Sequence, residues 1–473
     1  MSFKINKLFN KCYPMDFTYK NDGDISSLIR SFFHRNHENV ANCTISGIDA
    51  FPNWFTETGT RYDYVLLCLV INMYLFLGVA IVCDEYCVPS VERLCYKLNM
   101  SYDVAGATFL AMATSAPEFF VNLYATFLTE GDMGIGTIVG SSTFNSLAIT
   151  AFCGFSAGMV GISLDWWPLS RDLLWNTLNI ILLALFMFDG YIFWYEAAIL
   201  ITSFFINIIN LSLDAVIQKK IRDPEKPCPC ICYVPRGPVQ DFVKMLDPDH
   251  SGEESFNFSR WPKNDNKWVK FIWCISYPLE VLMFLTIPNV RRDWGRKYYM
   301  LGLIMSIIWI SILTYLISWM LTVVGYYLQI PDSIMGITIL AIGTSIPEAI
   351  SSVIVTKKGY GSMAVCNAVG SNNFNISFCL GVPWLFKAIF MPANLHHQYQ
   401  YAISINSASI FYSTAILVAS CLILYASFLA TRFQLGFGVA IICLISYLVY
   451  IVLAVTLEMY VFEEQNLPHC PHT

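Results

Sequence analysis

Residues 106–145 read GATFLAMATSAPEFFVNLYATFLTEGDMGIGTIVGSSTFN, and residues 336–375 read GITILAIGTSIPEAISSVIVTKKGYGSMAVCNAVGSNNFN. The two stretches align without a gap, and sixteen of the forty positions are identical. The identities fall on Gly, Pro, Ser, Thr, Asn and Glu as well as on apolar residues. Chance similarity between apolar segments would match mainly Leu and Ile, so this pattern indicates an internal duplication.

The composition around the repeats is that of a membrane protein. The chain is 56% hydrophobic and only 13% charged, whereas a soluble domain carries about 25% charged residues. Several apolar runs exceed the roughly 20 residues that cross a bilayer. We therefore predict an all-α polytopic membrane protein with about ten transmembrane helices. The expected spans are 62–83, 103–129, 133–160, 170–188, 192–216, 298–325, 333–355, 362–386, 401–430 and 435–461.

Basic residues predict how the chain is oriented. Lys and Arg are frequent in 84–102 and 217–268 and absent from 326–332, as expected if the first two are cytoplasmic. The apolar segment 269–290 is followed by four basic residues, so it is predicted to lie in the interface rather than to span. The repeats then start at the second and seventh helices. This odd offset predicts two inverted five-helix repeats, as in secondary transporters.

With these spans and this orientation, the chain is predicted to have five parts. They are an extracellular segment 1–61, a first transmembrane half 62–216, a cytoplasmic loop 217–297, a second half 298–461 and an extracellular tail 462–473. The first 60 residues contain no apolar stretch typical of a cleavable signal peptide. A glycosylation sequon at Asn42 predicts a glycoprotein.

Two glutamates carry the prediction of function. Glu118 and Glu348 occupy the same position in TSAPE and TSIPE, within apolar spans. An ionisable group at mid-membrane costs about 2.5–3.5 kcal/mol or more, and it needs a partner or a function. Neither repeat offers an Arg or Lys in its apolar interior, so a cation is the expected partner.

The neighbouring residues suggest which cation. Pro117 and Pro347 lack the N–H that closes a helical turn, so they leave backbone carbonyls nearby without a partner. Hard ions such as Ca²⁺ take six to eight oxygen ligands at about 2.3–2.6 Å, and Na⁺ is close to Ca²⁺ in size. Two carboxylates can be neutralised by one Ca²⁺ or two Na⁺, which favours exchange. No Cys–His cluster of a zinc site occurs in either repeat. The candidate oxygen ligands are Glu118, Glu348, Thr114, Ser115, Thr344, Ser345, Asn145, Asn375 and the carbonyls of Ala111, Ala113, Ala341 and Gly343.

The GSSTFN and GSNNFN segments follow the TSxPE segments in each repeat. Gly140 and Gly370 are expected to allow close helix approach. Ser141 and Asn145 lie four residues apart, as do their counterparts in the second repeat, so each pair shares a helix face. We expect the side chains on that face to point toward the glutamate of the same repeat.

These motifs make the chain similar to a known family. From about Asn42 onward it resembles the potassium-dependent sodium/calcium exchangers of the cation/Ca²⁺ exchanger superfamily. The likeness includes NCTISGIDAFPNWF, AIVCDEYCVPSVERLC, DVAGATFLA, LDWWPLSRD, and MAVCNAVGSNNFN followed by GVPW. The resemblance implies antiport of cytosolic Ca²⁺ against external Na⁺ by alternating access. It adds Ser141, Ser371 and Asn372 to the ion ligands.

Two positions depart from the pattern that the resemblance implies. Position 348 is Glu where this branch usually has Asp. Position 375 is Asn where the branch usually has the Asp tied to K⁺ binding. A neutral amide removes one charge, so K⁺ cotransport is left open and K⁺-independent Na⁺/Ca²⁺ exchange is an alternative.

Other functions remain open at this point. In Ca²⁺/H⁺ exchange, protons on Glu118 and Glu348 would replace Na⁺. A channel or an intramembrane enzyme would use the same polar residues differently. The expectation is a transporter without cofactors that meets inorganic cations and the lipid bilayer, with no nucleic acid partner, as a monomer or homodimer. The plasma membrane is the expected location, and an intracellular organelle membrane is the alternative.

Overall fold

The computed structural model describes residues 51–52, 61–98, 109, 111–159, 161–221, 267–290, 295–357, 359–390, 402–405, 407 and 409–461. All of them belong to one compact unit, Thr44–Thr473. The Asn42 sequon, the predicted tail 462–473, nearly all of segment 1–61 and most of loop 217–297 lie outside the described residues.

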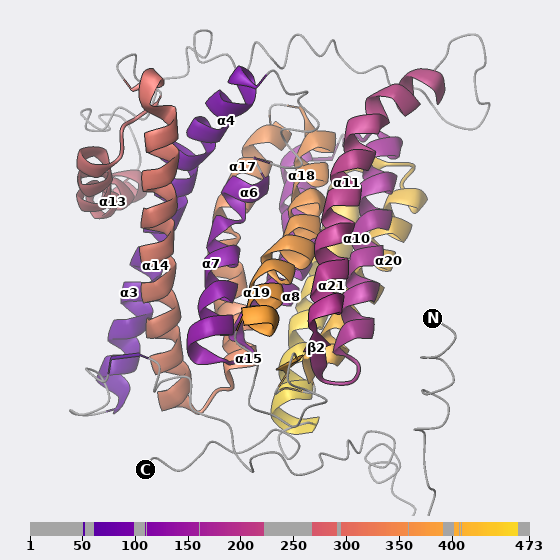
Figure 1. The fold of residues 1–473 in the computed structure, drawn as a ribbon. Coiled ribbons are helices and arrows are strands. Elements are labelled where there is room, and N and C mark those ends of the chain that lie inside the picture. Colours follow the sequence, from indigo (N-terminus) through magenta and orange to yellow (C-terminus); the bar gives the residue numbers. More distant parts are fainter. Residues whose placement is uncertain are drawn as a thin grey trace, which may run out of the picture. The chain divides into compact units, whose positions relative to one another are not determined.

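The first half of the chain is helical almost throughout, and several helices contain π-helical turns (Figure 1). Its elements are α3 (Arg61–Val82), η3 (Cys83–Cys87), α4 (Val88–Lys97), α6 (Ala111–Thr114), α7 (Ala116–Tyr124), η5 (Ala125–Thr129), α8 (Met133–Thr143), η6 (Phe144–Ile149), α9 (Thr150–Ala157), β1 (Ile162–Ser163), α10 (Trp166–Met187), β2 (Tyr191–Phe193) and α11 (Trp194–Ile221).

The second half repeats this order after one additional helix. Its elements are α13 (Lys267–Thr286), η7 (Arg296–Tyr298), α14 (Tyr299–Leu328), α15 (Asp332–Met335), η8 (Gly336–Leu340), α16 (Ala341–Thr344), α17 (Ile346–Lys357), α18 (Gly361–Phe374), η9 (Asn375–Cys379), α19 (Gly381–Phe390), β3 (Ala402–Ser404), α20 (Ser409–Ala430), β4 (Gln434–Leu435), α21 (Phe437–Thr456) and η10 (Leu457–Val461).

The described helices are long and apolar enough for a polytopic membrane protein. Eight helices qualify as spans by length and composition, and the bent pair 332–344 and 346–357 makes a ninth. Segment 111–129 has a break at the equivalent position. Residues 103–108 and 110 of that predicted span lie outside the described residues, so the tenth span stays a prediction. Helices are the structure expected here, because a helix satisfies its backbone groups internally within a bilayer.

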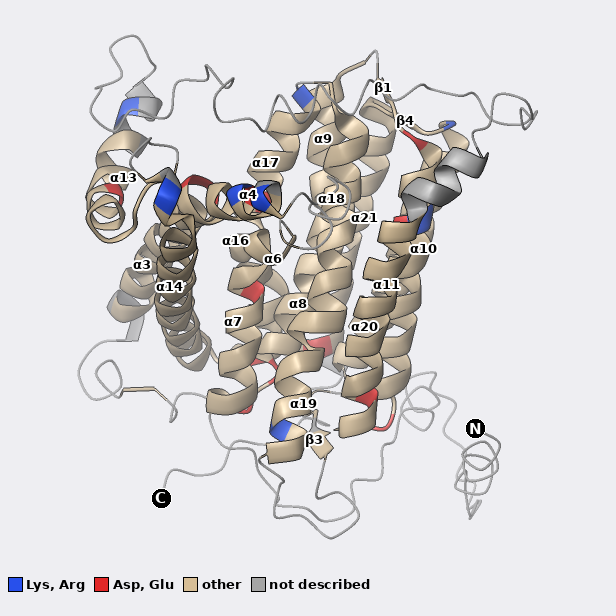
Figure 2. Cartoon of the chain, turned by 45° about the horizontal axis from the view of Figure 1, so that its top comes forward, with Lys and Arg blue, Asp and Glu red and all other residues tan. Residues whose placement is uncertain are grey.

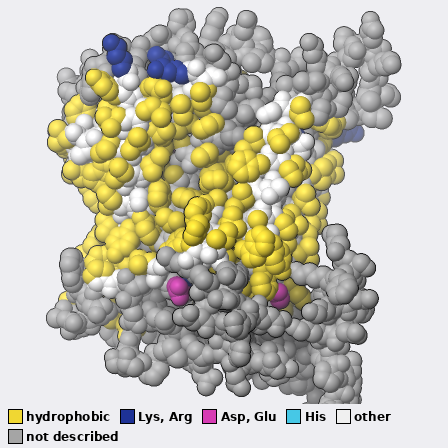
Figure 3. Space-filling view, viewed as in Figure 1, with side chains coloured by type: hydrophobic (Ala, Val, Ile, Leu, Met, Phe, Trp, Pro, Cys, Tyr) yellow, Lys and Arg dark blue, Asp and Glu magenta, His cyan; other side chains and the backbone are white. Residues whose placement is uncertain are grey.

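Apolar side chains face outward along the flanks of the bundle (Figure 3). Leu66, Leu185 and Leu285 are 66%, 65% and 74% exposed. In Figure 3, Lys and Arg lie at the upper edge of this apolar surface and Asp and Glu at its lower edge. A surface of this kind is matched to lipid rather than to water.

Helix α13 is the ambiguous segment of the sequence. Its apolar stretch, Trp273–Thr286, is shorter than a span, and Figure 1 shows it running at an angle to α14. Leu279 and Met283 are buried in a cluster formed with α3 and α14, and Trp309 Nε1 donates to Thr286 Oγ1 at 2.9 Å. The helix is therefore fixed to the side of the bundle.

One predicted span begins later than expected. The prediction placed a helix over 401–430, whereas residues Ala402–Ser404 form strand β3 and the helix starts at Ser409. Strand β3 pairs antiparallel with β2, and β1 pairs with β4. Each of these two-stranded pairs contains one strand from each half of the chain. The pairing satisfies backbone N–H and C=O groups at the ends of the neighbouring helices.

The two halves also meet through glycine. A Cβ on Gly140 would lie 2.4 Å from the Ile337 carbonyl oxygen, and a Cβ on Gly336 would lie 2.4 Å from that of Met133. The close approach predicted for Gly140 is therefore confirmed. For Gly370 no described atom outside its own helix lies within 4 Å of the Cβ position. Residue 107, which is equivalent to Ile337, lies outside the described residues, so close approach at Gly370 stays a prediction.

Candidate cation site

Each TSxPE segment contains a break between two short helices. Ser115 (φ −96°, ψ 11°) separates α6 from α7, and Ser345 (φ −88°, ψ 0°) separates α16 from α17. Helices 332–344 and 346–357 meet at 43°. Proline is the local cause, because its ring clashes with the preceding turn and it lacks an N–H. The break therefore follows from Pro117 and Pro347.

The two glutamates lie in the first turn after each break. Glu118 is the third residue of α7, Glu348 is the third residue of α17, and both residues are 0% exposed. A helix N-terminus favours a negative charge, which lowers the cost of placing a carboxylate there. The structure brings these two predicted residues together with the serines of the breaks.

The hydrogen bonds run between the repeats. Ser115 Oγ donates to Glu348 Oε1 at 3.1 Å, and Ser345 Oγ donates to Glu118 Oε1 at 3.5 Å. Serine 115 corresponds to serine 345, and glutamate 118 to glutamate 348, so the two bonds are related by exchange of the halves. This reciprocity is the signature of a pseudo-two-fold axis through the site.

The two carboxylates are not equally supplied with donors. Glu348 Oε2 also accepts from Asn145 Nδ2 at 2.5 Å and from Ser371 Oγ at 3.2 Å. Glu118 Oε2 is buried and accepts no hydrogen bond from the described residues. A buried charged oxygen without a partner is costly, so Glu118 has an oxygen available to a cation.

Further oxygens on the GSSTFN and GSNNFN segments are buried and also have no hydrogen-bond partner within the described part of the chain. They are Asn145 Oδ1, Asn372 Oδ1 and Ser142 Oγ. Asn372 Nδ2 donates to the Ser142 carbonyl at 3.1 Å and to Ser146 Oγ at 2.9 Å, which holds the amide across the two repeats. Neutral amide and hydroxyl oxygens are suitable ligands for Ca²⁺ or Na⁺. Ser142 was not predicted, although it occupies the position equivalent to Asn372.

One prediction about this face needs correction. Asn145 was expected to look at the glutamate of its own repeat, but it bonds Glu348 of the other repeat. Asn375 was expected to look at Glu348, but among the described residues its Oδ1 accepts only from Cys379 Sγ, at 3.6 Å. The π-helical turns η6 and η9 begin at Phe144 and Asn375. A wider turn changes the direction of the side chains that follow, and a plain helical count misses this effect.

Some predicted ligands are occupied within their own helices. Thr114 Oγ1 donates to the Ala111 carbonyl at 3.3 Å, and Thr344 Oγ1 donates to the Leu340 carbonyl at 3.0 Å. The carbonyls of Ala111 and Ala341 accept from the Ser115 and Ser345 amides. They are thus not the carbonyls left free by the prolines, which was the expectation. Ser141 Oγ donates to the Ile138 carbonyl at 3.3 Å. A hydroxyl that donates keeps its oxygen lone pairs, so it can still accept a cation.

Together these features define a class of protein. Two inverted repeats in a polytopic helical membrane protein share one buried acidic centre, built from broken helices that meet near the middle of the bundle. This is the arrangement of secondary transporters.

The chain belongs to the sodium/calcium exchanger protein family, whose sequence profile matches residues 68–213 and 298–456. Sodium/potassium/calcium exchanger 5 of Homo sapiens is 34% identical, over 91% of this chain and 91% of that protein. Sodium/potassium/calcium exchanger 4 of Mus musculus is 30% identical, over 91% of this chain and 87% of that protein. The resemblance found in the sequence is thereby confirmed.

Solved structures of a sodium-calcium exchanger, NCX_Mj, are also similar to this chain. The structure soaked with 100 mM Na⁺ and 10 mM Sr²⁺ is 23% identical, covers 83% of this chain and 97% of its own, and gives a TM-score of 0.43.

Proposed function

We propose that this chain is a secondary active antiporter that exchanges Ca²⁺ for Na⁺ by alternating access. The observation that carries the proposal is the pair Glu118 and Glu348, fully buried, contributed by two inverted repeats, and hydrogen-bonded across them. One Ca²⁺ or two Na⁺ neutralises this pair, so the ions compete for one site. Its sequence relatives are named as sodium/potassium/calcium exchangers.

The ligand set that we propose combines charged and neutral oxygens. The carboxylates of Glu118 and Glu348 supply the charge, and the side chains of Ser115, Ser345, Asn145, Ser371 and Asn372 surround them. Thr114, Thr344, Ser141 and Ser142 complete the ligand set through hydroxyl oxygens. Because both repeats lie in one chain, a single chain forms a complete site, and the transport unit that we propose is the monomer or each half of a homodimer.

The charge distribution supports an orientation in the membrane. In Figure 2, Lys and Arg gather at the end of the bundle that carries α4 and the end of α17, apart from a patch at α19. Lys97, Lys297 and Lys357 belong to the first end and Lys387 to α19. The positive-inside rule makes the first end cytoplasmic. Inward Na⁺ flow would then extrude cytosolic Ca²⁺ across the plasma membrane, and α13 would lie in the cytoplasmic interface.

The K⁺ requirement depends on Asn375. Its side chain is 0% exposed and carries no charge, and its Nδ2 is buried without an acceptor among the described residues. A third cation at this position would have no additional carboxylate to neutralise it. We therefore propose that exchange proceeds without K⁺, and that Asn375→Asp introduces a K⁺ requirement.

The test is Na⁺-gradient-driven ⁴⁵Ca²⁺ uptake into proteoliposomes. Vesicles loaded with Na⁺ are diluted into Na⁺-free medium, with and without K⁺, for the wild type, Glu118→Gln and Asn375→Asp. Wild-type uptake should require the Na⁺ gradient and fall to background in Glu118→Gln. Uptake driven equally well by a proton gradient would favour Ca²⁺/H⁺ exchange, and flux without any counter-ion would indicate a channel. A K⁺ requirement in the wild type would overturn the proposal for Asn375.

A further inference from the structure

An aromatic ring outside the repeats lies against the second break. A Cβ placed on Gly343 would lie 2.2 Å from Cε1 and from Cζ of Phe76, and 2.6 Å from Cδ1. These distances are far below van der Waals contact, so the edge of the ring fills the space that any side chain at position 343 would need. The contact therefore depends on glycine at this position.

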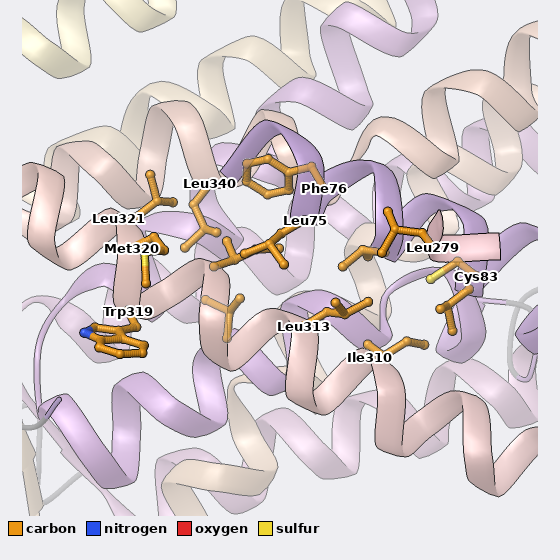
Figure 4. Close-up of a cluster of buried hydrophobic side chains, with 14 of the residues drawn as sticks. Leu75, Phe76, Cys83, Leu279, Ile310, Leu313, Trp319, Met320, Leu321 and Leu340 are labelled. Atoms are coloured by element: carbon orange, nitrogen blue, oxygen red, sulfur yellow. The ribbon is translucent and has the colours of Figure 1, made fainter. Parts of the chain in front are cut away.

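The ring is held firmly in place. Phe76 is 3% exposed and belongs to a buried cluster that includes Leu75, Leu340 and Leu313. Figure 4 shows Phe76 and Leu340 within this cluster, together with residues of α14. Helix α3 packs along α14 and also contacts α16 and α17. A closely packed interior resists changes in volume, so the ring acts as a rigid support for α16.

The supported position lies next to the site. Gly343 precedes Thr344 and is two residues from Ser345, whose hydroxyl donates to Glu118 at 3.5 Å. The Ser345 N–H donates to the Ala341 carbonyl at 3.3 Å, so the position of Ser345 depends directly on α16. Small shifts of α16 would therefore move the Ser345 hydroxyl relative to Glu118 directly.

The two repeats differ at this position. Gly343 corresponds to Ala113 in the first repeat, which carries a Cβ. The close contact with a ring from α3 is thus a property of the second break, and symmetry of the repeats does not require it. A feature that departs from the internal symmetry of the site needs its own explanation.

We infer that Phe76 is a positioning residue for the cation site: its ring, seated on Gly343, fixes the second helix break and with it Ser345 opposite Glu118. The inference rests on the proposed function. The Phe76 side chain is a hydrocarbon ring without an oxygen, so it does not itself bind the ion. The Phe76 ring fixes the positions of the ligand side chains on α16 and α17 before the ion binds.

Four variants test this inference: Gly343→Ala, Phe76→Ala, the double variant, and Leu75→Ala as a control from the same cluster. The measurements are half-saturating Ca²⁺ and maximal rate in proteoliposomes, ⁴⁵Ca²⁺ binding to purified protein, and the melting temperature. Loss of a residue that orients metal ligands costs about tenfold to a hundredfold in affinity. We expect losses of that size for Gly343→Ala and Phe76→Ala, and a partial return in the double variant, where the new methyl group has room.

The control separates positioning from packing. Leu75→Ala should lower the melting temperature while half-saturating Ca²⁺ stays within about twofold of wild type, since affinity follows ligand placement. An equal shift in Leu75→Ala, or no recovery in the double variant, would overturn the inference. If Gly343→Ala yields no folded protein, Phe76→Leu replaces it. Unchanged Ca²⁺ affinity in Phe76→Leu would also overturn the inference. Failure of wild-type exchange would count against the proposed function, whereas the binding measurement still tests Phe76.

Discussion

The two glutamates of the site differ in their surroundings more than in their sequence context. Glu348 accepts from Ser115, Asn145 and Ser371 through both of its oxygens, whereas Glu118 accepts a 3.5 Å bond from Ser345 through Oε1 and none from the described residues through Oε2. The sequence predicted the paired carboxylates and most of the surrounding oxygens. It did not predict which glutamate each donor would serve, because that depends on how the repeats face one another.

Asn145 offers a direct test of this arrangement. Asn145→Ala removes the 2.5 Å bond to Glu348 and a buried amide oxygen. We expect half-saturating Ca²⁺ to rise by about tenfold or more, as for loss of a residue that orients a metal ligand. Asn122→Ala is the control, since Asn122 is buried but donates to the Cys379 carbonyl. It should reduce stability with little change in Ca²⁺ affinity, and equal effects in both variants would contradict the assignment.

At the scale of the elements, the broken helices could be predicted and the π-helical turns could not. A proline inside an apolar repeat marks a break by itself. Turns such as η6 and η9 are single wider turns inside longer helices, and no residue type marks them as proline marks a break. The start of α20 at Ser409 was missed because strand β3 depends on pairing with β2, which is distant in the sequence.

The contact between α8 and η8 yields a prediction with a matched control. Gly140→Ala would place a methyl group 2.4 Å from the Ile337 carbonyl. Overpacking of this kind costs about 1–3 kcal/mol, so the melting temperature and transport rate should both fall. The control is Gly438→Ala on α21, an exposed position where a Cβ meets no described atom within 4 Å, so both quantities should stay near wild type. Equal losses in the two variants would mean that the interface is not specific to Gly140.

At the scale of the whole molecule, a polar network joins four helix ends. Glu458 accepts from Ser333 Oγ at 2.5 Å and from Ser407 Oγ at 2.9 Å, and the Ser407 amide donates to Asp132 Oδ2 at 2.5 Å. These residues belong to the ends of α8, α15 and η10 and to the segment before α20. Buried polar networks of this kind rigidify the structure only when they are satisfied.

Removing one member should therefore loosen that end of the bundle. Ser407→Ala keeps the backbone bond to Asp132 but removes a donor to buried Glu458, a loss of about 1–3 kcal/mol or more for a charged acceptor. The expected result is a lower melting temperature with nearly unchanged Ca²⁺ affinity. Ser156→Ala is the comparison, because that exposed hydroxyl donates to the Phe152 carbonyl of its own helix. A Ser407→Ala protein as stable as Ser156→Ala would contradict a structural role for the network.

The proposed orientation is testable on intact cells. Asp189 and Lys357 are both exposed. Asp189 follows the C-terminal end of α10, Lys357 ends α17, and the proposed orientation puts them on opposite sides of the membrane. With Cys274 replaced by Ser, Asp189→Cys should gain labelling by an impermeant maleimide over the parent chain, because positive-inside sidedness places it outside. Lys357→Cys should gain labelling only after permeabilisation. The reverse pattern would invert the proposed topology.

The unequal hydrogen bonding of Glu118 and Glu348 has a kinetic consequence. Two monovalent ions bound side by side would face unlike anions: Glu348 accepts from Ser115, Asn145 and Ser371, whereas Oε2 of Glu118 accepts no bond from the described residues. The ion beside Glu118 would be held more tightly, and the ion beside Glu348 would depart first. Loading and unloading would then proceed in a fixed sequence, with two distinguishable Na⁺ affinities in one turnover, even though the chain was built by duplicating a single half.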